Sequence, residues 1–196
     1  IEQVEGGLTR LAAVFSSKIP TVIGPVRSAR ISDIEILQQY GRVAFAYSGA
    51  QSKLLPVIAA ANLENLGAQR QSPEIYATDP LRVAPTAMML QAQKLMARVA
   101  AAKLPISISK SVGWSFGEAP AGGVAIDLVS LRWPASKYEA TWSKTENRWL
   151  LSNGGVANFA AGGKQLGATT FVIQTVEMSD SIYRGSDGSY TPLSET

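Results

Sequence analysis

The chain has 196 residues, of which 46% are hydrophobic and 17% are charged, and its formal net charge is +3. This composition indicates a folded globular protein and excludes a chain that is disordered throughout. The sequence contains no histidine and no cysteine, which excludes a Ser-His-Asp triad, a thiol nucleophile, disulfide bonds and imidazole or thiolate metal ligands.

The first half of the chain alternates strand-like and helix-like hydrophobic patterns, which is typical of an α/β layer architecture. The expected strands are residues 8–15 and 43–47, and the expected helices are residues 28–40, 54–63 and 86–103. Ser32 and Glu35 have the spacing of a capping box, so the regular part of the first helix is expected to begin somewhat after Ser28. Pro85 suits the first turn of the third helix.

The second half has no helical hydrophobic period, and its pattern predicts a β-meander. Its expected strands are residues 124–133, 138–142, 148–151 and 169–178, and the last of these has the strongest β pattern. Residues 144–147 are predicted to form a hairpin turn. The sequence therefore predicts an α+β fold. An N-terminal α/β region with a mixed sheet and helices, residues 1–111, would precede a β-rich C-terminal region, residues 112–196.

Residues 24–30, with the sequence Gly-Pro-Val-Arg-Ser-Ala-Arg, form the most informative segment. Arg27, Ser28 and Arg30 precede an expected helix, whose first turn adds unpaired backbone N–H groups and a partial positive charge. Guanidinium groups bind carboxylates and phosphates in a bidentate manner, so this segment is a candidate anion site. Alternatively, the two arginines tie the loop to internal carboxylates such as Glu5 or Asp33.

Other candidate ligand-binding residues lie outside this segment. Arg10 and Arg82 could join the site if the fold brings them close to it. Ser48 begins a polar loop between an expected strand and an expected helix. Such loops often bind ligands in α/β sheets, although a plain strand–helix turn is the simpler interpretation. No acidic spacing is typical of a metal site and no cofactor motif is complete, so we expect neither a metal nor a cofactor, and we assign no catalytic residue.

Four segments of the chain together resemble the YerB-like family of bacterial cell-envelope lipoproteins. They are residues 4–15 (Val-Glu-Gly-Gly-Leu-Thr-Arg-Leu-Ala-Ala-Val-Phe), residues 24–30, residues 82–85 (Arg-Val-Ala-Pro), and the pattern that runs from Tyr138 through Trp149 and Gly154 to residues 171–176. The resemblance implies an N-terminal α/β region followed by a β-rich region. It also implies export and membrane anchoring through an N-terminal lipid that this sequence does not contain.

Composition and resemblance lead to one expected function and two alternatives. Residues 1–110 contain 12 basic and 7 acidic residues, a net charge of +5, without the dense basic face that nucleic-acid binding requires. We expect an extracytoplasmic envelope module that binds an anionic wall component or a cell-wall-synthesis partner, and no nucleic acid. One alternative is an enzyme acting on phosphorylated or glycan envelope substrates, in which arginines stabilise developing charge and Glu5 or Asp33 is the base. The other is a protein adaptor that uses the edge of the C-terminal β region.

Overall fold

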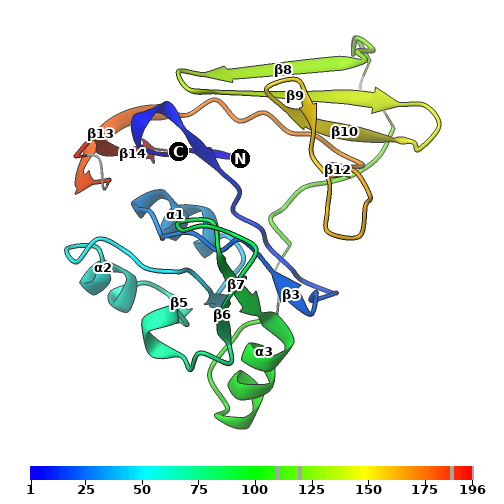
Figure 1. The fold of residues 1–196 in the computed structure, drawn as a ribbon. Helices are drawn as coiled ribbons and strands as arrows, with labels where there is room; N and C mark the ends of the chain where they lie inside the picture. Colours follow the sequence, from blue (N-terminus) through cyan, green and yellow to red (C-terminus); the bar gives the residue numbers. More distant parts are fainter. Residues whose placement is uncertain (109–110, 119–120, 186–187, 196) are drawn as a thin grey trace. The chain divides into compact units, whose positions relative to one another are not determined.

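The structure is a computed structural model that describes residues 1–108, 111–118, 121–185 and 188–195 (Figure 1). Its contacts divide the chain into two compact units, neither of which is continuous in sequence. The β-rich unit comprises Ile1–Leu11, Ser115–Ser179 and Ser194–Thr196, and the α/β unit comprises Ala12–Trp114 and Asp180–Leu193. The sequence placed a single boundary at residue 111. In the structure, the chain passes from one unit to the other four times, after residues 11, 114, 179 and 193.

The α/β unit is built from short strands and three α-helices within the described residues. Its elements are β3 (Val22–Ile23), α1 (Ile31–Gln38), β4 (Val43–Phe45), α2 (Leu55–Ala60), β5 (Leu63–Asn65), the 3₁₀ helix η2 (Ala68–Arg70), β6 (Tyr76–Thr78), β7 (Met88–Gln91) and α3 (Ala92–Ala101). Strands β3, β7 and β6 form an antiparallel sheet, and β4 pairs in parallel with β5. Within the described residues, none of the helices has the length and apolar character needed to cross a lipid bilayer.

Two buried clusters stabilise the α/β unit. In the first cluster, α1 and α2 pack against the parallel pair through Leu37, Phe45 and Ile58, and Ile58 is completely inaccessible. In the second, α3 packs against β7 through Leu90 and Leu95. Burial of large aliphatic and aromatic side chains stabilises a fold by about 1.5–3 kcal/mol for each residue. These clusters therefore fix the positions of the loops that leave β4 and β5.

The predicted helix over residues 86–103 is wrong in its first part. Residues 88–91 form strand β7, and α3 begins only at Ala92. A short apolar run such as Met88-Met89-Leu90 fits a helix face or a buried strand equally well. Pairing with β3 on one side and β6 on the other decides in favour of the strand.

Two further N-terminal predictions need correction. Only Thr9–Arg10 (β2) of the predicted strand over residues 8–15 pairs, and it pairs with β1 (Glu2–Gln3). Helix α1 begins at Ile31, and its cap is formed by Arg30 and Asp33 instead of Ser32 and Glu35. The Arg30 backbone N–H donates to Asp33 Oδ2 at 2.6 Å. A carboxylate at the third helical position thus satisfies the N–H group before the helix.

The predicted β-meander is present in the β-rich unit. Its elements are β1, the 3₁₀ helix η1 (Glu5–Gly7), β2, β8 (Leu128–Trp133), β9 (Ser136–Ser143), β10 (Arg148–Asn153), β11 (Val156–Ala157) and β12 (Gly167–Ala168). Strands β8 to β11 are consecutive neighbours, and β12 also pairs with β10. Two final strands, β13 (Glu177–Arg184) and β14 (Tyr190–Glu195), pair with each other. The strand-rich C-terminal part and the helix-containing N-terminal part confirm the predicted α+β class.

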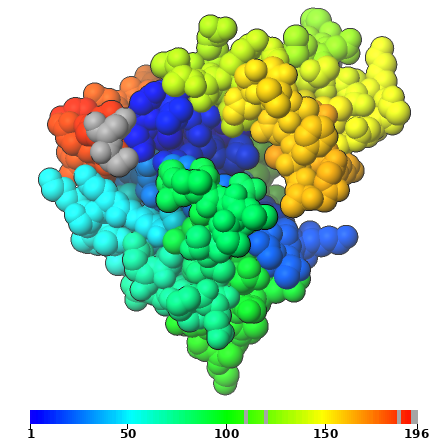
Figure 2. Space-filling model, in the orientation of Figure 1, coloured from blue at the N-terminus to red at the C-terminus, as the bar shows by residue number. Residues whose placement is uncertain are grey.

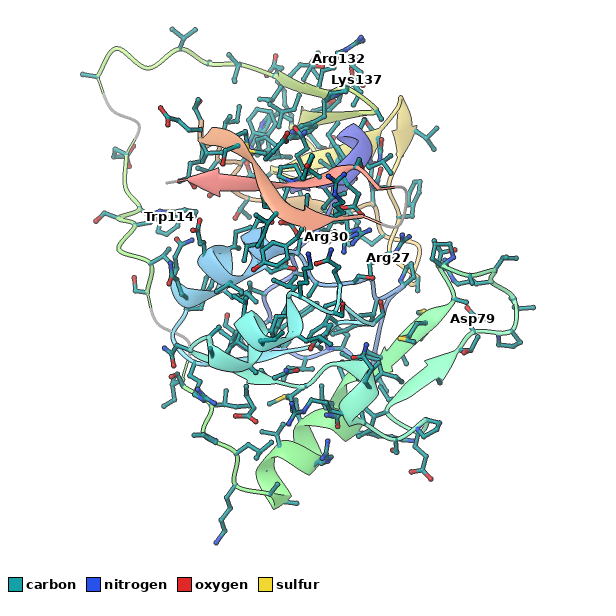
Figure 3. The ribbon with its side chains drawn as sticks, turned by 90° about the vertical axis from the view of Figure 1, so that its left-hand side faces the viewer. Arg27, Arg30, Asp79, Trp114, Arg132 and Lys137 are labelled. Carbon is teal, nitrogen blue, oxygen red and sulfur yellow. The ribbon has the colours of Figure 1, made fainter. Side chains whose placement is uncertain are left out.

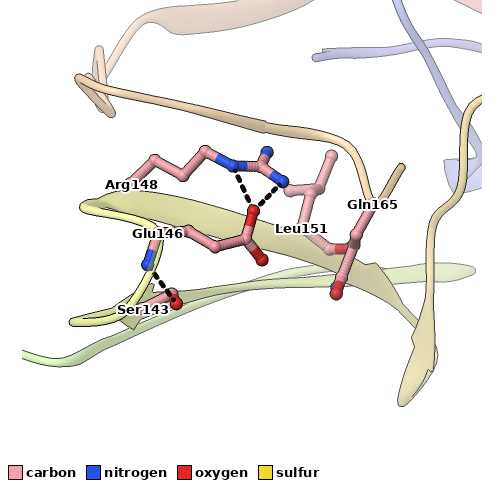
Figure 4. Close-up of polar contacts among 5 residues, drawn as sticks. All are labelled: Ser143, Glu146, Arg148, Leu151 and Gln165. Atoms are coloured by element: carbon pink, nitrogen blue, oxygen red, sulfur yellow. Dashed lines mark hydrogen bonds and ion pairs between the residues drawn. The ribbon is translucent and has the colours of Figure 1, made fainter.

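The hairpin between β9 and β10 turns at residues 144–147, as predicted (Figure 4). The Glu146 backbone N–H donates to Ser143 Oγ at 3.1 Å, and Arg148 donates to Glu146 Oε2 from Nε at 2.9 Å and from a terminal nitrogen at 2.6 Å. Asn147 adopts the left-handed conformation with φ of 50°, which asparagine tolerates better than most residues. Local contacts alone therefore fix this turn.

The predicted strand over residues 169–178 is wrong except at its last two residues. Residues 171–176 have no regular structure, and β13 begins at Glu177. Val172 and Ile173 are 54% and 55% exposed. Strand preference reflects packing on a pleated, half-buried surface more than backbone preference. These residues lack such a surface within the described residues, so their high β propensity does not produce a strand.

Candidate functional site

The loop formed by residues 24–30 is held by backbone hydrogen bonds on both sides. The Val26 N–H donates to Met88 O at 2.7 Å. On the other side, the Ala29 N–H donates to Gly49 O at 2.8 Å and the Ser48 N–H donates to Arg27 O at 3.0 Å. The structure therefore brings together two loops that the sequence identified separately, the arginine loop and the loop that begins at Ser48.

A third loop lies beside these two. The Leu66 N–H donates to Phe45 O and the Ala68 N–H donates to Tyr47 O, each at 2.9 Å. Because β4 and β5 are parallel, their carboxyl ends meet at one edge, which is where open α/β sheets commonly bind ligands. We call residues 27–30, 47–49 and 66–70 the β4–β5 loop edge.

Arg30 has a structural role at this edge. It is only 9% exposed, and one terminal nitrogen of its guanidinium donates to Ser28 O at 3.2 Å and to Ala29 O at 3.0 Å. The side chain thus folds back on its own loop while its backbone N–H caps α1 through Asp33. These two carbonyl bonds help to hold the loop in shape.

Arg27 differs from Arg30. Its side chain is only partly buried, and no described residue forms a hydrogen bond or ion pair with its guanidinium group. Figure 3 shows both arginines on the loop before α1. The Ser48 side chain, also partly buried, lies in the segment paired with Arg27, and no described residue bonds to its hydroxyl. Arg27 and Ser48 are therefore available to bind an external group.

Tyr47 and Arg70 are two residues of this edge that sequence reasoning missed. The Tyr47 hydroxyl donates to Asn65 Oδ1 at 2.9 Å. Burial raises the pKa of Tyr47, and the Asn65 hydrogen bond and the positive charge of Arg70 partly oppose that rise. The charge of Arg70 therefore acts at this edge. Arg70 follows β5 in the chain as Ser48 follows β4. This matching position is the signal that could have identified Arg70 from the sequence.

Gly67 allows the loops to approach closely. A Cβ atom at this position would collide with the ring of Tyr47, so the third loop can pass over the tyrosine only if residue 67 has no side chain. The close approach fixes the distance between the loops that follow β4 and β5.

The remaining predicted residues pair elsewhere. Arg82 lies in the loop between β6 and β7, where its Nε pairs with Asp79 Oδ2 at 3.1 Å, and Figure 3 shows Asp79 on that hairpin. Arg10 belongs to the β-rich unit and pairs with Glu5 at 3.5 Å. Glu5 and Asp33 are the candidate bases of the alternative enzyme. Glu5 pairs with Arg10, and Asp33 accepts a hydrogen bond from the backbone N–H of Arg30. No group of three or more potential metal ligands occurs in the described parts of the chain.

A family model described as "Protein of unknown function (DUF3048) N-terminal domain" matches residues 2–105, which is more than half of the chain. The chain belongs to this family. Its fold is similar to the crystal structure of the YerB protein from Bacillus subtilis, with a TM-score of 0.70 and 18% sequence identity. The alignment covers 97% of this chain and 64% of that protein, so the chain spans less than two thirds of it. No curated protein matches the chain. These comparisons confirm the resemblance to the YerB-like family.

Proposed function

We propose that this member of the DUF3048 family is a binding module of the bacterial cell envelope, and that its β4–β5 loop edge holds an anionic group of a wall polymer. The observation that supports the proposal most strongly is Arg27, whose guanidinium has no partner among the described residues. The proposed location outside the cytoplasm, with a lipid anchor, follows from the resemblance to envelope lipoproteins. If the partner is a protein, we propose that the same edge binds a cell-wall-synthesis protein.

The chemistry of the edge favours an anion over a neutral ligand. Arg27 offers a planar donor group that fits a phosphate or carboxylate, and the hydroxyl of Ser48 can add a further donor. Arg70 contributes a second positive charge whose effect reaches Tyr47. Arg30 already holds the loop in place, so little conformational entropy would be lost on binding.

The experiment is a titration of the protein with an anionic wall polymer and with a neutral glycan of similar length, at low and high salt. We expect wild type to bind the anionic polymer and high salt to weaken that binding, because salt screens charges near the surface. Arg27→Ala should weaken binding at least about tenfold, the equivalent of 1.4 kcal/mol. Arg27→Lys should weaken it less, because lysine keeps the charge but loses the planar fork.

Arg132→Ala is the matched control. Arg132 is an exposed arginine of the β-rich unit whose guanidinium group forms no hydrogen bond or ion pair with a described residue, so its loss changes the net charge equally. Unchanged binding in this variant would show that the position of the charge matters. Equal weakening by both alanine variants, or equal binding of the neutral glycan, would contradict the proposal.

A further inference from the structure

A pocket of about 460 Å³ lies where α1, α2 and β13 meet, and none of its lining residues belongs to the β4–β5 loop edge. Its volume falls within the range of roughly 300–1,000 Å³ that is usual for small-ligand sites. All of its lining residues belong to the α/β unit, and Tyr183 of β13 packs against the first buried cluster. Figure 2 shows the surface of α2, in cyan, directly below that of β13 and β14, in orange and red.

The walls of the pocket are mainly aliphatic, and its charged side chains are all acidic. Ile31, Ile34, Val57 and Ile182 provide the apolar surface, and Tyr183 adds an aromatic ring. Glu35 and Asp180 are the two charged residues of the lining, which contains no lysine or arginine. The pocket therefore combines apolar walls with negative charge that no cation of its own lining neutralises.

Glu35 has an unsatisfied atom in this pocket. Its Oε2 is buried and has no hydrogen-bond partner among the described residues, which is unusual because buried polar atoms are nearly always paired. The nearby hydroxyl of Ser181 cannot supply the missing bond, because it donates to Thr191 O at 2.6 Å. A donor from outside the chain would remove the desolvation penalty of this oxygen.

We propose that this pocket binds an aliphatic primary ammonium group, free or at the end of a lysine side chain. The ammonium would donate to Glu35 Oε2, and its alkyl stem would lie against the isoleucine and valine side chains. Asp180, which is exposed, would add a second negative charge, and the ring of Tyr183 can attract a cation. This site is independent of the anion site proposed above.

The composition of the lining excludes the other obvious cation. Hard metal ions such as Ca²⁺ require about six to eight oxygen ligands. Two carboxylates among aliphatic side chains do not provide them, and the described residues contain no cluster of three or more metal-ligating side chains. An ammonium group needs only a few acceptors and gains from apolar contact along its stem.

The experiment is a titration of the full chain with n-pentylamine, followed by the NMR signals of the methyl groups of Ile31, Ile34 and Val57. We expect saturable shifts of these signals. 1-Pentanol, which has the same stem without the charge, should bind at least about tenfold more weakly, equivalent to 1.4 kcal/mol. Nα-acetyl-lysine amide identifies the source of the ammonium group. Binding comparable to that of pentylamine indicates a lysine side chain, and weaker binding indicates a free amine. Both results support the proposed ammonium site.

Two variants test the role of the carboxylates. Glu35→Gln keeps the size of the side chain and should weaken pentylamine binding at least about tenfold, equivalent to 1.4 kcal/mol, and Asp180→Asn should weaken it less. Glu74→Gln is the matched control, because Glu74 is an exposed glutamate of the same unit outside the pocket. The proposal is overturned if pentylamine gives no saturable shifts, if pentanol binds equally well, or if both Glu35→Gln and Asp180→Asn bind like the control.

Discussion

The two units of this chain are stabilised in different ways. In the α/β unit, large side chains from helices and strands are buried in two continuous clusters. In the described residues of the β-rich unit, the buried apolar side chains are Val4, Tyr138 and Ala140. That unit instead has long strand ladders, with six residue pairs between β8 and β9 and six between β9 and β10.

This difference indicates where each unit is sensitive to mutation. Loss of a buried side chain leaves a cavity and should affect the α/β unit most. Interference with backbone pairing should affect the β-rich unit most. The α-helices of the described chain lie in the α/β unit, whereas three of the four tryptophans, Trp133, Trp142 and Trp149, lie in the β-rich unit. The fourth, Trp114, ends the segment Ala12–Trp114 of the α/β unit, so fluorescence is measured in a Trp114→Phe background to follow the β-rich unit separately.

The largest expected effect is that of Ile58→Ala. Ile58 is 0% exposed in the first buried cluster, so its truncation should lower the free energy of unfolding by about 2–5 kcal/mol. The measurement is urea unfolding, followed by far-ultraviolet circular dichroism for the helices and by tryptophan fluorescence for the meander. Val156→Ala, at a position 71% exposed, should change stability by less than about 0.5 kcal/mol. Equal losses in the two variants would contradict the proposed difference between the units.

The next effect separates the two arginines of the loop at residues 24–30. Arg30→Ala removes the bonds to Ser28 O and Ala29 O and should destabilise the unit by about 1.5–3 kcal/mol, the usual range for charged donors. Arg27→Ala removes no bond to a described residue and should change stability by less than about 0.5 kcal/mol. Thermal unfolding monitored by circular dichroism provides both values. A large loss in Arg27→Ala would show that Arg27 is also structural.

Gly167→Ala tests the β-rich unit. A Cβ atom at Gly167 would collide with Trp149 O of the neighbouring strand, so we expect loss of the β10–β12 pairing and a destabilisation of about 1–3 kcal/mol. Tryptophan fluorescence during urea unfolding should report it. Gly162→Ala is the control, because nothing lies within 4 Å of its Cβ position. Similar stability of the two variants would show that β12 adds little to the sheet.

The smallest effect concerns Tyr76 and the pH dependence of the α/β unit. Burial raises the pKa of Tyr76 far above its ordinary value, and its hydroxyl donates to Leu66 O at 2.7 Å. Because the folded state favours the neutral phenol, this contribution to stability is complete below pH about 10, the ordinary tyrosine pKa, and is lost as the pH rises further. Tyr47 shifts in the same direction.

Tyr76→Phe should therefore have two measurable consequences. At neutral pH it should lower the free energy of unfolding by about 0.5–1.5 kcal/mol through loss of the hydrogen bond. Above pH about 10 the stability of the variant should decline less steeply than that of wild type. Circular dichroism during denaturant unfolding at a series of alkaline pH values measures both, and parallel declines would show that Tyr76 does not titrate with unfolding.

Some elements could be predicted because their determinants are local. The turn between β9 and β10 depends on Ser143, Glu146 and Asn147, which lie within a few residues of one another. The apolar face of α1, with Ile31, Ile34 and Leu37, packs on the first cluster as its helical spacing predicted. Predictions from composition, from a helical hydrophobic period and from turn residues require no knowledge of contacts between distant segments.

Other features depended on segments distant in sequence. The run from Met88 to Gln91 became a strand because β3 and β6 pair with it, whereas residues 171–176, with stronger β propensity, have no regular structure. The sequence identified Arg27 and Arg30 but could not distinguish their roles. Arg30 turned back on its own loop, and Arg27 did not.

The sequence by itself therefore determined the α+β class, the meander and the family. Only the tertiary structure decided that Ser48 lies beside Arg27, and that Glu35 of α1 lines a pocket with residues of β13. The physical reason is the distance along the chain. Helical period and turn preference act over a few residues, whereas strand pairing and burial join segments that only the complete fold brings together.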